Sequence, residues 1–535
     1  MAAGFAVAAD VFWSAIIVGI CILLTRIWHV MWLKPRRIRS MLLKQGIRGP
    51  KPRFFYGNTQ EMKNIQSNIS NTHLQPRPID AISHSAWVRS MLPYFQQWAQ
   101  QYGPVYMYST MNKQHLYVDH PELIKAMNLH NSLDLGRPRY LSKPMAPLFG
   151  NGIIRANGPH WAHQRKLIAP EFFLNKAKHM LEVMEESTIA MIKKWQTKIE
   201  NNGRVADVSV EKELKGVAAD IISKVCFGSS YFQGKQIFAK SAALQEALSK
   251  PSSLFGLSNF RFLPTKSNRE IWRLQKEVET MILQIVNERR EKSKGSNKPE
   301  EDLLQAILEN ATNRDTHLQA TANINSIIVD NCKNIYFAGH ETTALTASWC
   351  LLLLALHPEW QERVRAEIAE ICGDNLNDCL LDLDKLRQLK TLNMVIQETL
   401  RLYGPAVIAA REAFADIKLG DMTIPKGTNI WILITALHRD PENWGPDANE
   451  FKPERFAGGI AEACKYPQSY IPFGFGNRLC IGQTFAYLQL KILLSLILSN
   501  FCFALSPEYC HSPKYNMLLV PEHGIRLLVS KVNGY

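Results

Sequence analysis

Paired cysteine motifs are the clearest absence in this sequence. Its ten cysteines include no C-x2-C pair and no Cys/His spacing suited to structural zinc, which argues against the common zinc modules. Their usage agrees with a reducing compartment, where we expect most of them to be small buried hydrophobes. Internal repeats are also absent, and only residues 292–302 have the composition of a flexible surface turn.

The composition can fill a sizeable core. Of the 535 residues, 46% are hydrophobic, 10% aromatic and 21% charged, which excludes a wholly disordered, collagenous or disulfide-scaffold chain. At about 150 residues per domain the length suggests three or four units, although this quotient is only a prior and does not exclude one large domain. The order of the patterns described below predicts a mixed fold that is mainly α with small β regions, the α+β class.

The positive charge is concentrated at one end. The chain carries a net charge of +14, and its first 53 residues hold nine basic residues against one acid, Asp10, which leaves +6 for the other 482. A basic cluster beside an apolar stretch is what a membrane surface attracts, whereas a nucleic-acid face needs basic residues on the folded domain. We therefore expect a lipid bilayer as a partner and no nucleic acid.

A membrane anchor is predicted at the N-terminus. Residues 11–25 form an uncharged apolar run, and extension to Leu33 reaches the length of one span if Arg26 snorkels. A cleaved signal peptide is the alternative, but no basic residue precedes the run and no small-x-small pattern follows it. The basic residues after the span place the N-terminus in the lumen of the endoplasmic reticulum and the rest in the cytosol. The sequons at Asn68 and Asn310 should then stay unmodified.

Three parts are expected along the chain. Residues 1–33 are the lumenal tip and anchor, residues 34–53 a basic hinge with Pro and Gly, and residues 54–535 one cytosolic catalytic domain. Short strands are predicted over 91–118, a long helix over 323–356 and turn-bounded strands over 417–433. A glycine-rich loop over 473–482 precedes a further predicted helix at 483–499.

That loop carries the strongest chemical signal. It places Cys480 among three glycines and beside Arg478, in the pattern F-x-x-G-x-R-x-C-x-G from Phe473 to Gly482. Glycines let the backbone approach something bulky and flat, and N–H groups at a helix start stabilise a thiolate. These features suit a heme iron with Cys480 as its axial ligand.

The loop resembles the heme-binding loop of the cytochromes P450, the heme-thiolate monooxygenases. Two more segments are similar to that family in the same order: Glu398-Thr399-Leu400-Arg401 resembles its E-x-x-R element, and Pro453-Glu454-Arg455-Phe456 resembles its P-E-R-F segment. The resemblance implies a structural charge network of Glu398, Arg401 and Arg455. It covers nearly the whole chain and implies the cytochrome P450 fold.

The predicted long helix bears a further match. Ala338-Gly339-His340-Glu341-Thr342-Thr343 is similar to the oxygen-activating segment of the family. A Thr hydroxyl that takes a helix carbonyl weakens the helix ladder, and an opened turn can hold water. The resemblance implies that Glu341 and Thr342 are catalytic and relay protons during oxygen activation. His340 and His163 are expected to be ordinary polar neighbours.

Binding of heme b (iron protoporphyrin IX) is implied for several polar residues. Trp161 and Arg165 match the W-x-x-x-R element of the family, and Arg411 and Arg478 fall where the family has further partners of the heme propionates. Three arginines and an indole N–H suit an anionic cofactor in an apolar pocket. Electrons are expected from NADPH through a separate partner, NADPH–cytochrome P450 reductase.

The substrate class is inferred from the resemblance of three segments of the sequence to a branch of the family. The segments at residues 45–66, 157–173 and 329–344 look like the plant branch that contains gibberellin oxidases, so we expect a gibberellin or related diterpenoid acid to be hydroxylated or epoxidised. A pentacyclic triterpenoid acid is the alternative substrate. The pocket is expected at residues 133–154, 255–262, 336–343, 406–410 and 515–518. Two other functions are less expected. A heme-thiolate isomerase or dehydratase needs no proton relay, so Glu341 and Thr342 argue against it, and a heme sensor is the non-enzymatic alternative.

Overall fold

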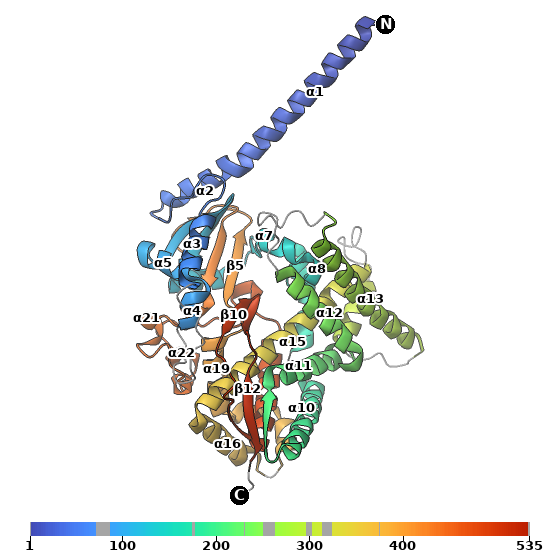
Figure 1. Ribbon diagram of the computed structural model, residues 1–535, viewed down its shortest axis with the longest axis vertical. Helices are drawn as coiled ribbons and strands as arrows, with labels where there is room; N and C mark the ends of the chain where they lie inside the picture. The colour runs from blue at the N-terminus through green and yellow to red at the C-terminus, as the bar shows by residue number, and fades with distance from the viewer. Residues whose placement is uncertain are drawn as a thin grey trace. The chain divides into compact units, whose positions relative to one another are not determined.

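The computed structural model describes residues 2–70, 86–173, 177–228, 231–249, 263–295, 302–312, 324–373 and 375–532 (Figure 1). These residues divide into two compact units. Unit 1 comprises residues 1–74, 92–136 and 410–433, and unit 2 comprises residues 75–91, 137–409 and 434–535. The predicted residues 255–262 of the pocket lie outside the described residues.

Unit 1 begins with helices. These are α1 (Ala2–Trp28), the π-helical η1 (His29–Leu33), α2 (Lys34–Leu43), α3 (Thr59–Ser70), α5 (Pro93–Tyr102) and α6 (Pro121–Leu129). Of the described residues, one helical stretch, Phe12–Leu43, is long and apolar enough to cross a membrane, with a mean hydropathy of 2.0 over an 18-residue window within it. Its side chains from Phe12 to Val30 include many large exposed hydrophobics, which is compatible with the predicted anchor.

The basic segment after the anchor starts as a helix. The helix α2 covers Lys34–Leu43 and buries Ile38 and Leu42, so the first part of the predicted hinge is regular. Arg39 then donates to the backbone carbonyls of Gly49 and Pro50. The irregular connection is thus shorter than residues 34–53 and is tied back to α2.

A five-stranded sheet forms the centre of unit 1, in the order β1-β2-β8-β5-β3. Its strands are β1 (Val105–Thr110), β2 (Lys113–Val118), β8 (Asn429–Leu433), β5 (Ile408–Ala413) and β3 (Leu135–Gly136), and a separate hairpin joins β6 (Ile417–Leu419) to β7 (Met422–Ile424). Strand β1 pairs antiparallel with β2, and β2 pairs parallel with β8. The strands predicted over 417–433 are confirmed, as are two strands within 91–118. The prediction of strands over 93–102 is wrong, because Pro93 starts a helix whose Phe95 and Trp98 are buried.

Unit 2 is mainly helical. Its helices of more than five residues are α4 (Ala86–Met91), α9 (Gly158–Ile168), α10 (Ala177–Asn201), α11 (Val210–Phe227), α12 (Tyr231–Ser249), α13 (Lys266–Gly295), α14 (Leu303–Thr312), α15 (Ile324–Leu356), α16 (Pro358–Cys372), α18 (Leu383–Gln388), α19 (Lys390–Tyr403) and α23 (Gln483–Asn500). Shorter helices are α7 (Arg139–Ser142), η3 (Lys143–Met145), α8 (Ala146–Phe149), η4 (Ala169–Phe172), α17 (Leu376–Leu380), α20 (Ile434–Leu437), α21 (Pro441–Trp444), η7 (Pro453–Phe456), α22 (Ile460–Ala463), η8 (Pro467–Ser469) and η9 (Gly476–Arg478). Two small antiparallel sheets add β4 (Val205–Ser209), β12 (Arg526–Lys531) and β9 (Phe501–Leu505), and β10 (Pro513–Asn516) and β11 (Leu518–Pro521).

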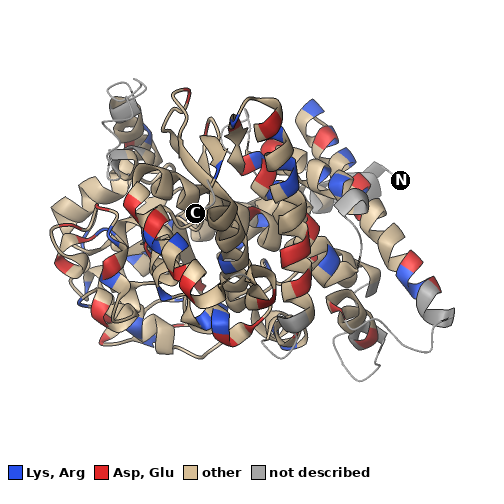
Figure 2. Ribbon diagram, turned by 90° about the horizontal axis from the view of Figure 1, so that it is seen from below, with Lys and Arg blue, Asp and Glu red and all other residues tan. Residues whose placement is uncertain are grey.

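The helix α15 is the core of unit 2. It matches the predicted helix almost residue for residue and ends before Pro358, which begins α16. Helix α11 packs along it (Figure 1). The approach is close because residue 339 is glycine: a Cβ there would lie 2.4 Å from Cδ1 of Ile222. Acidic and basic residues are interspersed along several helices of the protein (Figure 2), which is typical of solvated helix faces.

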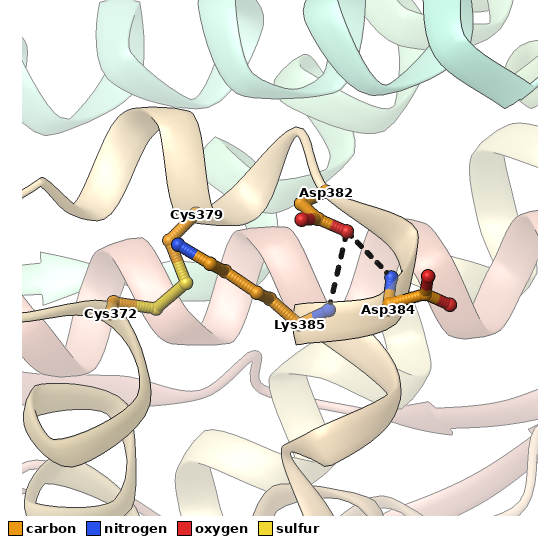
Figure 3. The surroundings of a disulfide bond; sticks show 5 residues. All are labelled: Cys372, Cys379, Asp382, Asp384 and Lys385. Carbon is orange, nitrogen blue, oxygen red and sulfur yellow. Dashed lines mark hydrogen bonds between the residues drawn. A yellow bond between two sulfur atoms is a disulfide. The ribbon is translucent and has the colours of Figure 1, made fainter.

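The cysteines agree with the expectation only in part, since Cys464, Cys502 and Cys510 are half-buried and Cys21 is exposed. Cys226, Cys332 and Cys350 are buried and unpaired, as predicted, but Cys372 and Cys379 form a disulfide (Figure 3). The chain turns at Gly373 after α16, and α17 brings the second cysteine back with a Cα–Cα distance of 5.2 Å. Asp382 then caps α18 by accepting from the backbone N–H of Asp384 (Figure 3).

Candidate active site

The loop before α23 presents the thiol of Cys480. Gly474 and Gly476 have φ values of +80° and +60°, a region that other residues rarely adopt, so the tight course of the loop depends on them. The backbone N–H of Cys480 donates to the carbonyl of Phe473 at 3.0 Å, and η9 lies between. The loop thus closes on itself before Gly482, the N-cap residue of α23.

The environment of the thiol is mixed. The side chain of Cys480 is exposed on one side, yet the protein atoms around its other sides desolvate it and raise its pKa. The backbone N–H of Gly482 and the charge of Arg165 act in the opposite direction and favour the thiolate. A cation that binds the open side of the sulfur would favour the thiolate further.

A cluster of three guanidinium groups lies beside this loop. Arg165 on α9 donates to the carbonyl of Leu479 at 2.8 Å, which links α9 to the Cys480 loop. The guanidinium of Arg478 lies 4.0 Å from the ring centroid of Trp161 and donates to Oδ1 of Asn157. Burial, together with the charges of Arg137 and Arg165, lowers the pKa of Arg478 to about 9. The sequence-predicted Trp161, Arg165 and Arg478 are therefore brought together.

No carboxylate among the described residues forms an ion pair with these three arginines. Arg137 is buried enough that desolvation lowers its pKa, and its Nε is a buried donor without a hydrogen-bond partner. Like charges at close range with lowered pKa values are unfavourable unless an anion joins them. An exposed thiol beside such a cluster fits heme, whose iron takes the thiolate and whose propionates take the arginines.

Arg411 is the remaining predicted propionate partner. It lies on β5, is buried, and its Nη1 donates to the carbonyl of Ala410. Both residues belong to unit 1, so its role in heme binding stays a prediction. Arg137 and Asn157 were not predicted as residues of the site. Only the folded structure brings them close to Arg478.

The oxygen-activating segment lies within α15. The hydroxyl of Thr342 donates to the carbonyl of Ala338 at 2.6 Å, and that of Thr346 donates to the carbonyl of Thr342 at 2.9 Å. The prediction that a Thr hydroxyl takes a helix carbonyl is confirmed. The opened turn is not present, since α15 is a continuous α-helix through this segment. A side-chain bond to the i−4 carbonyl nevertheless competes with the helix ladder here.

The neighbouring acid is tethered. The carboxylate of Glu341, which is mostly buried, lies 3.1 Å from Nζ of Lys215 on α11, and Lys215 also contacts Glu211 at 3.0 Å. Burial lowers the pKa of Lys215, but the two carboxylates outweigh it and the net effect is a raised pKa. His340 lies 3.3 Å from the same carboxylate, and burial lowers its pKa to about 4, so it is neutral near pH 7. Lys215 was missed because nothing in its local sequence distinguishes it from a surface lysine.

The predicted charge network is assembled in the core. Arg401 and Glu398 are fully buried and bidentate, with both N–O distances at 2.7 Å. Arg401 also donates to the carbonyls of His438, Ala448 and Glu450. Arg455 joins with its Nε 3.7 Å from Glu398 and its Nη1 3.1 Å from Asp447. The network ties α19 to the segment that leads to η7.

Three of the predicted pocket regions meet in one apolar cluster. Leu148 and Phe149 from α8 pack with Leu244 and Leu248 from α12 and with Ile271 and Leu274 from α13, and Phe337 and Met517 border them. The contribution of α12 and α13 was not predicted, because their periodicity indicates only a buried face.

The comparisons with known proteins agree with the fold. The family model described as "Cytochrome P450" matches residues 74–529. Cytochrome P450 714C2 of rice is 47% identical over 519 residues, which are 96% of this chain and 98% of the rice protein. Cytochrome P450 714A2 of Arabidopsis thaliana is 46% identical (97% and 98% covered), and cytochrome P450 714B3 of maize is 43% identical (100% and 98% covered).

The chain belongs to the cytochrome P450 family. The predicted plant family, the mainly α fold and the class of enzyme, an oxidoreductase of the monooxygenase type, are confirmed. The family implies heme as the cofactor and a reductase as the redox partner.

Proposed function

We propose that this monooxygenase uses NADPH-derived electrons from a separate reductase to insert one oxygen atom of O2 into a terpenoid. A gibberellin or related diterpenoid acid is the proposed substrate, with a pentacyclic triterpenoid acid as the alternative. One support is the apolar cluster of α8, α12 and α13 beside Phe337, which suits a rigid hydrocarbon skeleton. The other is the resemblance of three sequence segments to the plant branch that contains gibberellin oxidases.

The observation that carries the heme assignment is the arginine cluster beside Cys480. Arg137, Arg165 and Arg478 lack a carboxylate partner among the described residues and would receive the two propionates, while the thiolate of Cys480 would hold the iron. Bound there, heme b supplies the redox chemistry that activates dioxygen. The protein supplies position, charge and protons.

We propose that Glu341 and Thr342 deliver those protons. The hydroxyl of Thr342 holds a proton 2.6 Å from the carbonyl of Ala338 and can turn between this acceptor and a reacting oxygen. Glu341 is held by Lys215 at 3.1 Å, so its carboxylate stays ordered between α11 and α15. An acid next to an alcohol on one helix can pass a proton inward while excluding bulk water.

The chain is further proposed to be a single-pass protein of the endoplasmic reticulum with its N-terminus in the lumen. The apolar Phe12–Leu43 segment and the basic residues that follow support this topology. Residues 1–33, 34–53 and 54–535 would then be anchor, connection and catalytic domain. Expression in microsomes followed by glycosidase treatment tests it: the sequons at Asn68 and Asn310 should give no mobility shift, and a shift would reverse the topology.

The substrate is tested by mass spectrometry of products. Microsomes that contain the full chain and a plant reductase are supplied with NADPH and separate panels of gibberellins and triterpenoid acids. A gain of one oxygen on gibberellins supports the proposal, and a gain on triterpenoid acids alone selects the alternative. No product on either panel, with the heme spectrum intact, refutes both substrates but not the enzyme class.

A further inference from the structure

One turn of α15, over residues 330–334, is polar although it lies inside the protein. Asn331 and Asn334 are fully buried, and the side chain of Lys333 is only 3% exposed. Buried amides and charges cost free energy unless they are hydrogen-bonded or paired, so their partners show what such residues do. We call Asp330, Asn331, Lys333 and Asn334 the polar turn.

The polar turn binds the backbone of the loop that follows α8. Three of its side-chain oxygens accept backbone N–H groups of this loop: Asp330 from Asn151 at 2.7 Å, Asn331 from Ile153 at 3.1 Å and Asn334 from Ile154 at 2.8 Å. Nδ2 of Asn334 donates in return to the carbonyl of Phe149, the last residue of α8, at 2.7 Å. Because these backbone groups are satisfied by one turn of one helix, the course of the loop is fixed relative to α15.

Two glycines let the loop approach α15 this closely. A Cβ at Gly150 would lie 1.7 Å from Oδ1 of Asp330, and a Cβ at Gly152 would lie 2.4 Å from Nδ2 of Asn334. A side chain at either position would therefore push the loop away from the helix. The loop and the polar turn fit each other in shape as well as in hydrogen bonding.

The loop also shapes the apolar cluster that we propose as the substrate pocket. Phe149 and Ile154, at its two ends, belong to or pack against that cluster. The ring of Phe149 lies 5.0 Å from that of Phe337, which follows Asn334 by three residues on α15. Thr342 lies further along the same helix. One helix thus carries both the attachment of the pocket wall and the residue proposed to deliver protons.

A second wall of the cluster is attached to the same turn. Nζ of Lys333 lies 3.1 Å from Glu279 on α13 and 3.0 Å from Asp330. Helix α13 contributes Ile271 and Leu274 to the cluster. A lysine so deeply buried is rare unless it is paired, and here its pairing joins α13 to the residue that also holds the loop.

We propose that the polar turn is a specificity determinant that acts without touching the substrate. Asn331 and Asn334 are positioning residues that hold residues 149–154, and Lys333 holds α13, at a fixed place relative to Thr342. The walls then allow few orientations of a rigid substrate, and a misplacement of about 1 Å can cost about 100-fold in rate. The inference rests on the proposed function, in which the apolar cluster is the substrate pocket.

The test measures the shape of the pocket with small probes. The full chain, loaded with heme in nanodiscs, is titrated with imidazole, 1-phenylimidazole and 4-phenylimidazole, whose binding to the iron changes the heme absorption. Imidazole reports the iron alone, whereas the two isomers direct the same ring against different parts of the walls. Both isomers should bind the unaltered chain more tightly than imidazole does. If neither does, the apolar cluster does not line the site, which overturns the proposed pocket and this inference together.

Variants separate positioning from stability. Asn334→Leu removes both bonds to the loop at similar size and should change the Kd ratio of the two isomers several-fold, with the Kd of imidazole unchanged. Asn443→Leu is the matched control, because it removes a buried amide that accepts from the N–H of Tyr466 at 2.7 Å outside the cluster. It should lower the thermal unfolding midpoint without changing the ratio.

A second variant decides the question if Asn334→Leu does not fold. Gly152→Ala leaves Asn334 in place but pushes the loop away from it, so the ratio of the two isomers should change in the same direction. An unchanged ratio in the folded variant, or an equal change in Asn443→Leu, overturns the positioning role and leaves the proposed pocket standing.

Discussion

Removal of Arg401 should destabilise the protein more than removal of the charge on Glu398, although the two form one ion pair. In Arg401→Met, the fully buried carboxylate of Glu398 keeps only the backbone N–H of Lys452 at 2.9 Å and Arg455 at 3.7 Å. In Glu398→Gln, Arg401 keeps three carbonyl acceptors, those of His438, Ala448 and Glu450. The guanidinium that loses its partner in Glu398→Gln therefore keeps more hydrogen-bond partners than the carboxylate that loses its partner in Arg401→Met.

The magnitudes follow from burial. A buried pair that loses one partner typically costs about 3–5 kcal/mol, and we expect Arg401→Met near the upper end and Glu398→Gln at or below about 3 kcal/mol. Because domains unfold with about 5–15 kcal/mol, the arginine variant should retain little heme-loaded protein. The double variant should cost at least about 1 kcal/mol less than the sum of the two single variants, since neither charge is then left alone.

Urea denaturation followed by far-ultraviolet circular dichroism measures these differences. Arg387→Met is a matched control, because its ion pair with Asp384 is exposed and should contribute below about 1 kcal/mol. The reasoning is refuted if Glu398→Gln costs more than Arg401→Met, or if the two changes are additive.

Three further predictions concern the site and the pH dependence of the fold. Cys480→Ala should abolish the thiolate-type spectrum of the reduced carbonyl complex, whereas Cys464→Ala, at a half-buried cysteine, should preserve it; a preserved band in Cys480→Ala would refute the ligand. Thr342→Ala should divert electrons from product to peroxide, measured as product formed per NADPH. Thr346→Ala, which loses the same kind of hydroxyl-to-carbonyl bond one turn later, should not, and equal uncoupling in both would assign the effect to the helix. Burial lowers the pKa of His438 to about 3, and its Nε2 accepts from the N–H of Ile471. The unfolded chain therefore takes up a proton at His438 near pH 6.5 that the folded chain does not, so stability falls with pH below about 6.5, and this histidine contributes about 2 kcal/mol of the loss at pH 5. His438→Gln should show a correspondingly smaller loss between pH 7 and pH 5 in urea denaturation, and an unchanged pH profile would contradict the assignment.

Much of the fold could be predicted because it is encoded locally. The helix α15 has a long apolar pattern that a His-Pro pair ends, and the strands β6 to β8 are separated by Gly- and Pro-containing turns. The Cys480 loop has glycines at the positions where φ is positive. Patterns of this kind depend on neighbours along the chain, which the sequence displays directly.

The rest depends on contacts between distant segments. Lys215 is found beside Glu341 only because α11 packs along α15, and Arg137 is found near Arg478 only after the chain has folded. The helix over 93–102 was mistaken for strands because its aromatic residues suit either structure. The disulfide between Cys372 and Cys379 has a spacing that matches no recognised motif.

The burial of α15 has a consequence for amide hydrogen exchange. From Thr343 to Leu354 every residue is buried, so this half of the helix has no face from which it can fray into water. Its amides should exchange only when unit 2 unfolds as a whole, and their exchange rates would report the global free energy of unfolding. The turn that carries Thr342, which is proposed to deliver protons, lies at the N-terminal edge of this protected stretch.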